Sequence, residues 1–295
     1  MTLDLRRRFF AEEIEAVSRL RSGALVEAFA AVPRERFLPP GPWTVLGETD
    51  LTGVAPMKTR LTADADPARV HHNIGVAIDA ARQLFNGQPA TLGALIDALD
   101  LSTGQRVLHV GAGLGYYTAI MAHCVGPSGR VVAYEVDQAL AAGAERNLSS
   151  MPWVELRHGD ASRGHDTPES FHAILINAGV THPLPYWLDA LAPDGRMILP
   201  LTTSMSALGL AASPLGKGLV CLLTNEGAAI AARIVNVIMI YGAIGLRDES
   251  LGAALGKAMM GGPMHWQKVA HLRRDAHESD ATCWYHGSGF CLSTL

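Results

Sequence analysis

Three glycines separated by single residues follow an apolar run in the middle of the chain. The segment reads Val107-Leu108-His109-Val110-Gly111-Ala112-Gly113-Leu114-Gly115-Tyr116. Glycine permits the positive φ of a tight turn, and the N-terminus of a helix offers free N–H groups to polar ligand atoms. We therefore predict a strand, a ligand-binding turn and a helix. The third glycine comes one residue earlier than in a dinucleotide fingerprint, which argues against a nicotinamide or flavin site.

Polar side chains end or follow the next three predicted strands of the chain. Glu135 ends the run 131–134, Asp160 follows 156–159, and Asn177 follows 173–176. A carboxylate about 20 residues beyond the glycine turn can accept hydrogen bonds from both hydroxyls of a ribose. Asp160 is placed to meet an adenine edge. Because the carboxyl ends of parallel strands meet at one edge of a sheet, these side chains are expected to share a ligand.

With these motifs the chain resembles the class I methyltransferases that use S-adenosylmethionine, and more narrowly the protein-L-isoaspartate O-methyltransferase family. The narrower resemblance covers residues 10–245 and is carried by three further segments: Val32-Pro33-Arg34-Glu35-Arg36-Phe37-Leu38-Pro39, Asn86-Gly87-Gln88-Pro89, and Leu191-Ala192-Pro193-Asp194-Gly195-Arg196-Met197-Ile198-Leu199-Pro200.

The resemblance implies that S-adenosylmethionine is the cofactor. It assigns cofactor contacts to His109, Gly111, Gly113, Gly115, Tyr116, Glu135, Asp160 and Asn177. It assigns contacts with a protein or peptide substrate to Asn86, Gly87 and Gln88. The chain departs from the family pattern twice, with His109 in place of an acid and Gly87 in place of a serine or threonine.

The loop 177–183 contains no acid, and this bears on the methyl acceptor. A carboxylate is already ionised at pH 7 and needs no general base, whereas an amine or hydroxyl usually does. Gln88 is expected to orient the acceptor, and His182 is the residue best placed to act as a base. Methylation of a protein or peptide carboxylate is the first hypothesis. A small-molecule or modified-peptide acceptor is the second, and a non-catalytic cofactor-binding protein that signals through 40–85 is the third.

Composition places the chain among ordinary globular proteins. Of 295 residues, 48% are hydrophobic and 18% charged, and the net charge is −4, which offers no electrostatic basis for binding nucleic acid. Charged residues interrupt the first 20 positions and prolines interrupt the uncharged run 197–216, so neither a signal core nor a membrane span is predicted. A cytoplasmic location is expected.

The remaining histidines and cysteines predict no metal site. His71 and His72 are adjacent, so their side chains cannot face one ion from the same strand face, and a hydrogen-bonded or surface role is expected for both. The cysteines are scattered without a C-x-x-C pair, which favours free thiols. Cys283, His286 and Cys291 are expected to pack in the interior.

Hydrophobic periodicity and turn residues predict an α/β fold with a doubly wound, mostly parallel sheet of the Rossmann-like class. A helical N-terminal cap and substrate-facing segment is expected at 1–100, the cofactor-binding domain at 101–245, and a C-terminal extension at 246–295. Two helices separated at Gly23 are expected within 6–31. Helices are also expected at 88–99, at 116–125 and after a capping Asp137, with an antiparallel strand pair between 219 and 241.

Overall fold

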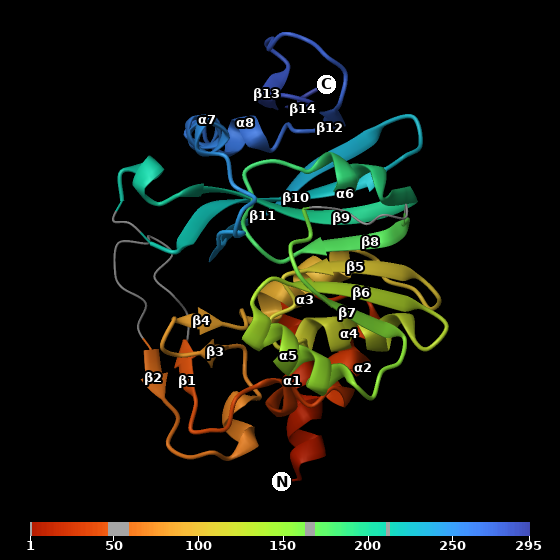
Figure 1. The fold of residues 1–295 in the computed structure, drawn as a ribbon, viewed down its shortest axis with the longest axis vertical. Helices are drawn as coiled ribbons and strands as arrows, with labels where there is room; N and C mark the ends of the chain where they lie inside the picture. Colours follow the sequence, from red (N-terminus) through yellow and green to blue (C-terminus); the bar gives the residue numbers. More distant parts are fainter. Residues whose placement is uncertain (1, 47–58, 163–168, 211–212) are drawn as a thin grey trace. The chain divides into compact units, whose positions relative to one another are not determined.

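The computed structural model describes residues 2–46, 59–162, 169–210 and 213–295. The chain forms two compact units (Figure 1). The first consists of Met1–Arg106 and Ala112–Gly159, and the second of Val107–Gly111 and Asp160–Leu295. The chain therefore passes between the units three times: at the Arg106-Val107 bond, at the Gly111-Ala112 bond inside the glycine turn, and at the Gly159-Asp160 bond. The three-part division expected from the sequence stays a prediction.

The first unit combines helices with a small antiparallel sheet and one parallel strand pair. The small sheet has the order β2-β1-β3-β4, and β6 pairs with β7 in parallel. In chain order the elements are α1 (Leu3–Ser18), α2 (Gly23–Ala31), η1 (Arg34–Phe37), β1 (Thr44–Leu46), β2 (Thr59–Leu61), η2 (Pro67–Val70), β3 (Gly75–Asp79), β4 (Leu84–Phe85), α3 (Pro89–Ala98), α4 (Tyr116–Val125), β6 (Arg130–Glu135), α5 (Gln138–Leu148) and β7 (Val154–His158).

The second unit is dominated by one mixed sheet with the strand order β13-β14-β12-β11-β10-β9-β8-β5. Its pairs β5–β8 and β8–β9 are parallel, and the pairs beyond β9 are antiparallel. The elements are β5 (Arg106–Val110), β8 (Phe171–Ile176), α6 (Pro185–Asp189), β9 (Leu191–Ser204), η3 (Ser206–Leu208), β10 (Leu215–Asn225), β11 (Ile230–Tyr241), α7 (Glu249–Met259), α8 (Pro263–Trp266), β12 (His271–Arg273), β13 (Cys283–Gly287) and β14 (Phe290–Ser293).

The predicted α/β class, with parallel core strands and N-terminal helices, is confirmed. The sheet is more antiparallel than the sequence suggested, because β9, β10 and β11 form a long meander and the C-terminal segment adds three more strands. Short connections allow only antiparallel pairing, whereas parallel neighbours need a crossover of a dozen or more residues. The expected antiparallel pair between 219 and 241 is β10 with β11.

Local sequence signals account for most helix ends. Pro89 is the first residue of α3, as expected, and the Asp137 side chain accepts hydrogen bonds from the backbone of the first turn of α5. The break between the first two helices differs from the expectation. Arg19 closes α1 in the left-handed conformation, and Ser22 caps α2, of which Gly23 is the first residue.

The parallel strands supply the most deeply buried apolar side chains. The residues at positions 173–175 of β8 and 131–133 of β6 all have no exposed surface. Because these strands are buried on both faces, they form a firmly packed support for the loops that follow them. Among the described residues, no helix combines the length and the apolar character needed to cross a membrane.

Candidate functional site

The glycine turn adopts the backbone geometry that its sequence predicts. Gly111, Gly113 and Gly115 have φ values of +88°, +57° and +93°. A Cβ on Gly111 would lie 3.1 Å from the Asn177 carbonyl oxygen, and one on Gly115 would lie 2.9 Å from a Leu148 methyl carbon. Larger residues would therefore be both strained and crowded, and Gly115 directly precedes the first turn of α4. The turn thus leads directly into the N-terminus of α4, and the free N–H groups of a helix N-terminus can bind polar ligand atoms.

Glu135 ends β6 with its carboxylate tied to two backbone amides. Gly113 N–H donates to Oε2 at 2.7 Å, and Asp137 N–H donates to Oε1 at 3.0 Å. The residue is only 7% exposed, and this burial raises the pKa of the carboxyl group although the amide hydrogen bonds oppose it. Each carboxylate oxygen has a further lone pair. Glu135 is thus held in one orientation against the glycine turn and can still accept hydrogen bonds from a ligand.

His109, on β5, has no exposed surface. Burial lowers the pKa of its imidazole from 6.5 to about 3. An imidazole with the ordinary pKa near 6.5 would make the affinity for a ligand at this position change with pH. The buried ring of His109 instead stays neutral throughout the range from pH 5.5 to 8.

Both tyrosines after the turn are buried. Tyr116 is 2% exposed and Tyr117 4%. The ring centroid of Tyr116 lies 5.8 Å from that of Phe37, and the Arg34 guanidinium carbon lies 5.9 Å from the Tyr116 centroid. The rings of Tyr116 and Tyr117 pack edge to face in one aromatic cluster. The contact of Tyr116 with a cofactor stays a prediction.

The segment before α3 is anchored by Asn86 and turned by Gly87. Asn86 Oδ1 accepts hydrogen bonds from Arg34 Nη2 and Val76 N–H, both at 3.0 Å, while its Nδ2 is buried and has no partner among the described residues. Gly87 has φ +77°, and a Cβ there would lie 2.9 Å from Leu92. Tyr117 Oη donates to the Gly87 carbonyl at 3.4 Å. The positive φ and the nearby Leu92 side chain therefore both favour glycine at position 87 over a residue with a Cβ.

Gln88 follows at the N-cap of α3, and its side chain makes no capping hydrogen bond. It is half-buried. Its amide group is therefore not committed to holding the helix end, which is compatible with the predicted contact to a substrate.

In the second unit, Asn177 follows β8 and forms hydrogen bonds with the end of β5, where the glycine turn begins. Its N–H donates to the Val110 carbonyl at 2.8 Å, and its Nδ2 donates to the Gly111 carbonyl at 3.3 Å. Asp160, the first residue after the chain re-enters this unit, accepts a hydrogen bond from Ser162 N–H at 2.8 Å. The structure brings Asn177 and Gly111 together, as it does Glu135 and Gly113 in the first unit.

His182 lies half-buried at the end of the loop 177–183. Its Nδ1 is 2.9 Å from Thr181 Oγ1, and its ring stacks on Phe290 with centroids 6.3 Å apart. Burial lowers the pKa of His182, and the nearby Asp248 partly opposes that shift. The imidazole is accordingly neutral at pH 7 and able to accept a proton.

Three residues that hold the loops of the site through hydrogen bonds were not predicted from the sequence. Arg34 is fully buried and donates hydrogen bonds to the carbonyls of Val70, His72 and Ile74 in addition to Asn86. Arg247 donates to the Gly179 carbonyl at 2.9 Å, and Tyr285 donates to the Thr181 carbonyl at 2.6 Å. Arg34 stood in a recognised motif without an assigned role. The other two come from segments distant in sequence, and no local pattern indicates where they pack.

His71 and His72 take the roles expected of them. His71 Nε2 lies 2.9 Å from Glu35 Oε2, and His72 is exposed. Arg7 also contacts Glu35. Although burial raises the pKa of Glu35, the hydrogen bonds from His71 and Arg7 lower it to about 2.

Comparison with known proteins places this arrangement in a family. Residues 67–211 match the family described as Protein-L-isoaspartate(D-aspartate) O-methyltransferase (PCMT). A protein-L-isoaspartate O-methyltransferase of Aeropyrum pernix is 32% identical over 195 residues, which cover 65% of either chain. Protein-L-isoaspartate O-methyltransferase 1 of Rhodopseudomonas palustris is 31% identical over 205 residues, covering 68% of this chain and 71% of that protein.

A solved structure has the same fold. It is a Plasmodium falciparum protein described as a beta-aspartate methyltransferase (PCMT) in complex with S-adenosyl-L-homocysteine. The TM-score is 0.57 at 14% identity, over 80% of this chain and 97% of that one. The sequence-based prediction of family and fold is confirmed: the chain belongs to the protein-L-isoaspartate(D-aspartate) O-methyltransferase family of S-adenosylmethionine-dependent methyltransferases.

Proposed function

We propose that this chain transfers the methyl group of S-adenosylmethionine to a carboxylate oxygen of a protein or peptide, in the cytoplasm. Family membership supports the reaction class. The observation that carries the choice of acceptor is the loop 177–183, which has His182 as its one titratable side chain and no acid. An ionised carboxylate is the acceptor that such a loop suits, because it has no proton to lose.

The residues around the glycine turn fit the cofactor. Glu135 is buried, oriented by two amides, and has lone pairs left for the two ribose hydroxyls. The three glycines place no side chain at their positions in the turn, and their positive φ values disfavour any other residue there. His109, Tyr116, Asp160 and Asn177 complete the proposed set of cofactor-binding residues.

S-adenosylmethionine supplies, when bound, an electrophilic methyl group on a sulfonium. The protein's own task is then to hold the acceptor oxygen in line and to exclude water. We assign the positioning of the acceptor to Gln88, with Asn86 and the Gly87 backbone beside it. No residue has to accept a proton during transfer to a carboxylate.

A second candidate is methyl transfer to a small molecule or a modified peptide. Gly87 favours it, since it offers no hydroxyl to an isoaspartyl substrate and its backbone conformation resists a side chain. His182 would serve there as the general base, because burial keeps its ring neutral at pH 7.

A methyl-transfer assay with an isoaspartyl peptide and its aspartyl twin decides between the candidates. The first candidate predicts low but measurable methylation of the isoaspartyl peptide alone. It also predicts that Gln88→Ala lowers kcat/KM at least tenfold while His182→Ala retains most of the activity, because only Gln88 acts on alignment. Gln88 makes no capping bond, so this substitution leaves the helix end intact.

The opposite pattern would reject the carboxylate acceptor. If His182→Ala abolishes transfer while Gln88→Ala leaves it intact, the acceptor carries a proton that a base must remove. The small-molecule or modified-peptide function then replaces the first proposal. Cofactor binding without methylation of any acceptor tested would point to the non-catalytic alternative.

A further inference from the structure

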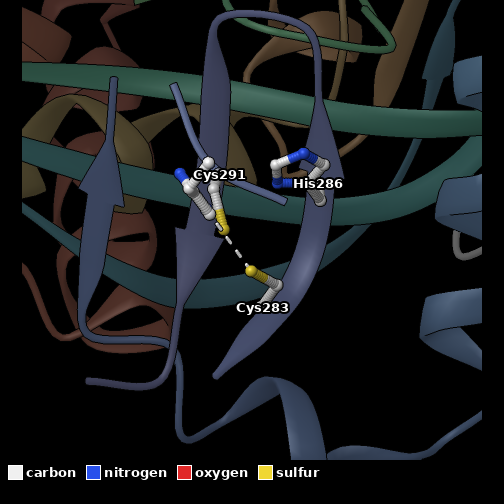
Figure 2. Close-up of side chains that lie close together, drawn as sticks. Cys283, His286 and Cys291 are labelled. Carbon is white, nitrogen blue, oxygen red and sulfur yellow. Dashed lines mark hydrogen bonds between the residues drawn. The ribbon is translucent and has the colours of Figure 1, made fainter. Parts of the chain in front are cut away.

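Four side chains that commonly bind metals converge at the C-terminal hairpin. They are His277, Cys283, His286 and Cys291, and one ligand atom from each lies within 4.8 Å of the corresponding atoms of the others. Figure 2 shows the sulfur atoms of Cys283 and Cys291 directed toward each other, with the His286 ring beside them. Cys291 is buried and the other three are half-buried. The family motifs lie elsewhere in the chain and do not account for this cluster.

An irregularity in β13 puts three of the four residues on one face of the hairpin. Cys283 and His286 are three positions apart, so a regular strand would direct them to opposite faces. The register with β14 shifts between Cys283 and Tyr285, and the extra residue restores a common face. His286 pairs directly with Cys291 across the strands. The bulge therefore assembles two thiols and an imidazole that the linear spacing separates.

His277 completes the set from the connection between β12 and β13. Its Nδ1 donates to the Asp275 carbonyl at 2.9 Å, which leaves the lone pair on Nε2 facing Cys283 Sγ at 3.5 Å. Such a backbone hydrogen bond is the usual way in which a metal-binding histidine is oriented. The Nδ1 atom of His286 is buried and has no hydrogen-bond partner among the described residues. A buried ring nitrogen of this kind is suited to bind an ion.

The geometry and the ligand types point to zinc. In a tetrahedral site with Zn–S and Zn–N bonds of about 2.3 and 2.0 Å, ligand atoms lie roughly 3.3–3.8 Å apart. The Cys283–His277 separation of 3.5 Å already meets this value, and the other pairs need to approach by about 1.5 Å at most. Two thiolates with two imidazoles form a set that selects Zn²⁺ over Mg²⁺ or Ca²⁺.

We propose that His277, Cys283, His286 and Cys291 bind one Zn²⁺ ion in a structural site. On binding, each thiol releases its proton to solvent, and the two thiolates neutralise the charge of the ion. All four positions are occupied by protein side chains, so the site has no open position for a substrate. The proposal revises the sequence-based expectation that these residues only pack in the interior.

The proposed ion would stabilise the support of the loop 177–183. The hairpin strands carry Tyr285, which donates to the Thr181 carbonyl at 2.6 Å, and Phe290, which stacks on His182. A link between β13, β14 and the preceding connection holds both aromatic side chains in place. The role is therefore structural, and it does not depend on which acceptor the enzyme methylates.

Zinc content and cobalt substitution test the site independently of activity. The full-length chain, reduced and purified without chelator, is expected to hold about one zinc per molecule. Replacing the zinc by Co²⁺ should give the visible bands of a tetrahedral ion and a sulfur-to-cobalt charge-transfer band. Cys283→Ser and Cys291→Ser should each lose the bound metal. Cys124→Ala, which removes a buried thiol of the first unit, is the matched control and should retain it.

Two outcomes would overturn the proposal. One is that the reduced chain binds neither zinc nor cobalt. This includes a chain in which Cys283 and Cys291 form a disulfide and which, after reduction, still binds no metal. The other is bound metal that persists unchanged in both folded serine variants. Should those variants fail to fold, the spectrum of the cobalt-loaded parent chain decides, because absence of the charge-transfer band excludes thiolate ligands.

Discussion

The buried His109 should make the stability of the protein depend on pH. Its imidazole has a pKa of about 3 in the folded chain and 6.5 as a model group. The pKa of His109 is lower in the folded chain than in the unfolded chain. Between pH 3 and pH 6.5 the unfolded chain therefore binds a proton at His109 and the folded chain does not. The stability present above pH 6.5 is therefore lost progressively as the pH falls toward 3.

The size of this effect follows from the two pKa values. Lowering the pH from 7.5 to 5.0 should reduce the free energy of unfolding by about 2 kcal/mol through His109 alone, since each pKa unit between the states corresponds to about 1.4 kcal/mol. Glu35 does not contribute in this window. Its pKa of about 2 is lowered from 4.5, so the stability it provides is lost only below about pH 4.5.

Urea denaturation of the parent chain and of His109→Gln, at pH 7.5 and 5.0, measures the difference. The glutamine variant cannot titrate, so its free energy of unfolding should fall by about 2 kcal/mol less than that of the parent over the same interval. His265→Gln, which replaces an exposed histidine, should behave as the parent does. Equal losses in the parent and His109→Gln would refute the assignment of a buried neutral imidazole.

Four further predictions concern the site and its supports. His109 should cause no change in cofactor affinity between pH 5.5 and 8, as measured by calorimetry. A fall in affinity below pH 6.5 that is absent in His109→Gln would contradict the structure. Glu135→Gln should weaken cofactor binding about tenfold or more, because charge-assisted hydrogen bonds contribute about 1.5–3 kcal/mol each, and unchanged affinity would reject the ribose contact. Gly87→Ser should lower the free energy of unfolding by about 1–3 kcal/mol, since a residue with a Cβ is strained at φ +77° and meets Leu92, and a neutral effect in thermal denaturation would show that the turn relaxes. Arg34→Met should cost about 3–5 kcal/mol through the buried carbonyl groups left without a donor, and a cost below 1 kcal/mol would mean that water replaces the guanidinium.

Local patterns in the sequence determine the elements around the glycine turn. The spacing of Gly111, Gly113 and Gly115 predicted positive φ values, because glycine adopts them at the lowest steric cost. Pro89 and Asp137 marked helix starts through a fixed φ and a side-chain acceptor. Glu135 was recognised because it ends a predicted strand at the distance from the glycine turn where a ribose-binding carboxylate is expected. Each of these signals acts within a few residues, and a linear sequence therefore contains it.

Tertiary packing alone decided the electrostatics and the long-range contacts. The sequence placed His109 at the turn, but only its complete burial makes the imidazole neutral, since desolvation depends on neighbours from distant segments. The bulge in β13 and the hydrogen bond from His277 to Asp275 help to bring four side chains together. The spacing of Cys283, His286 and Cys291 in the sequence did not predict this cluster. A strand's face is set by its register with the partner strand, and register is a property of the folded sheet.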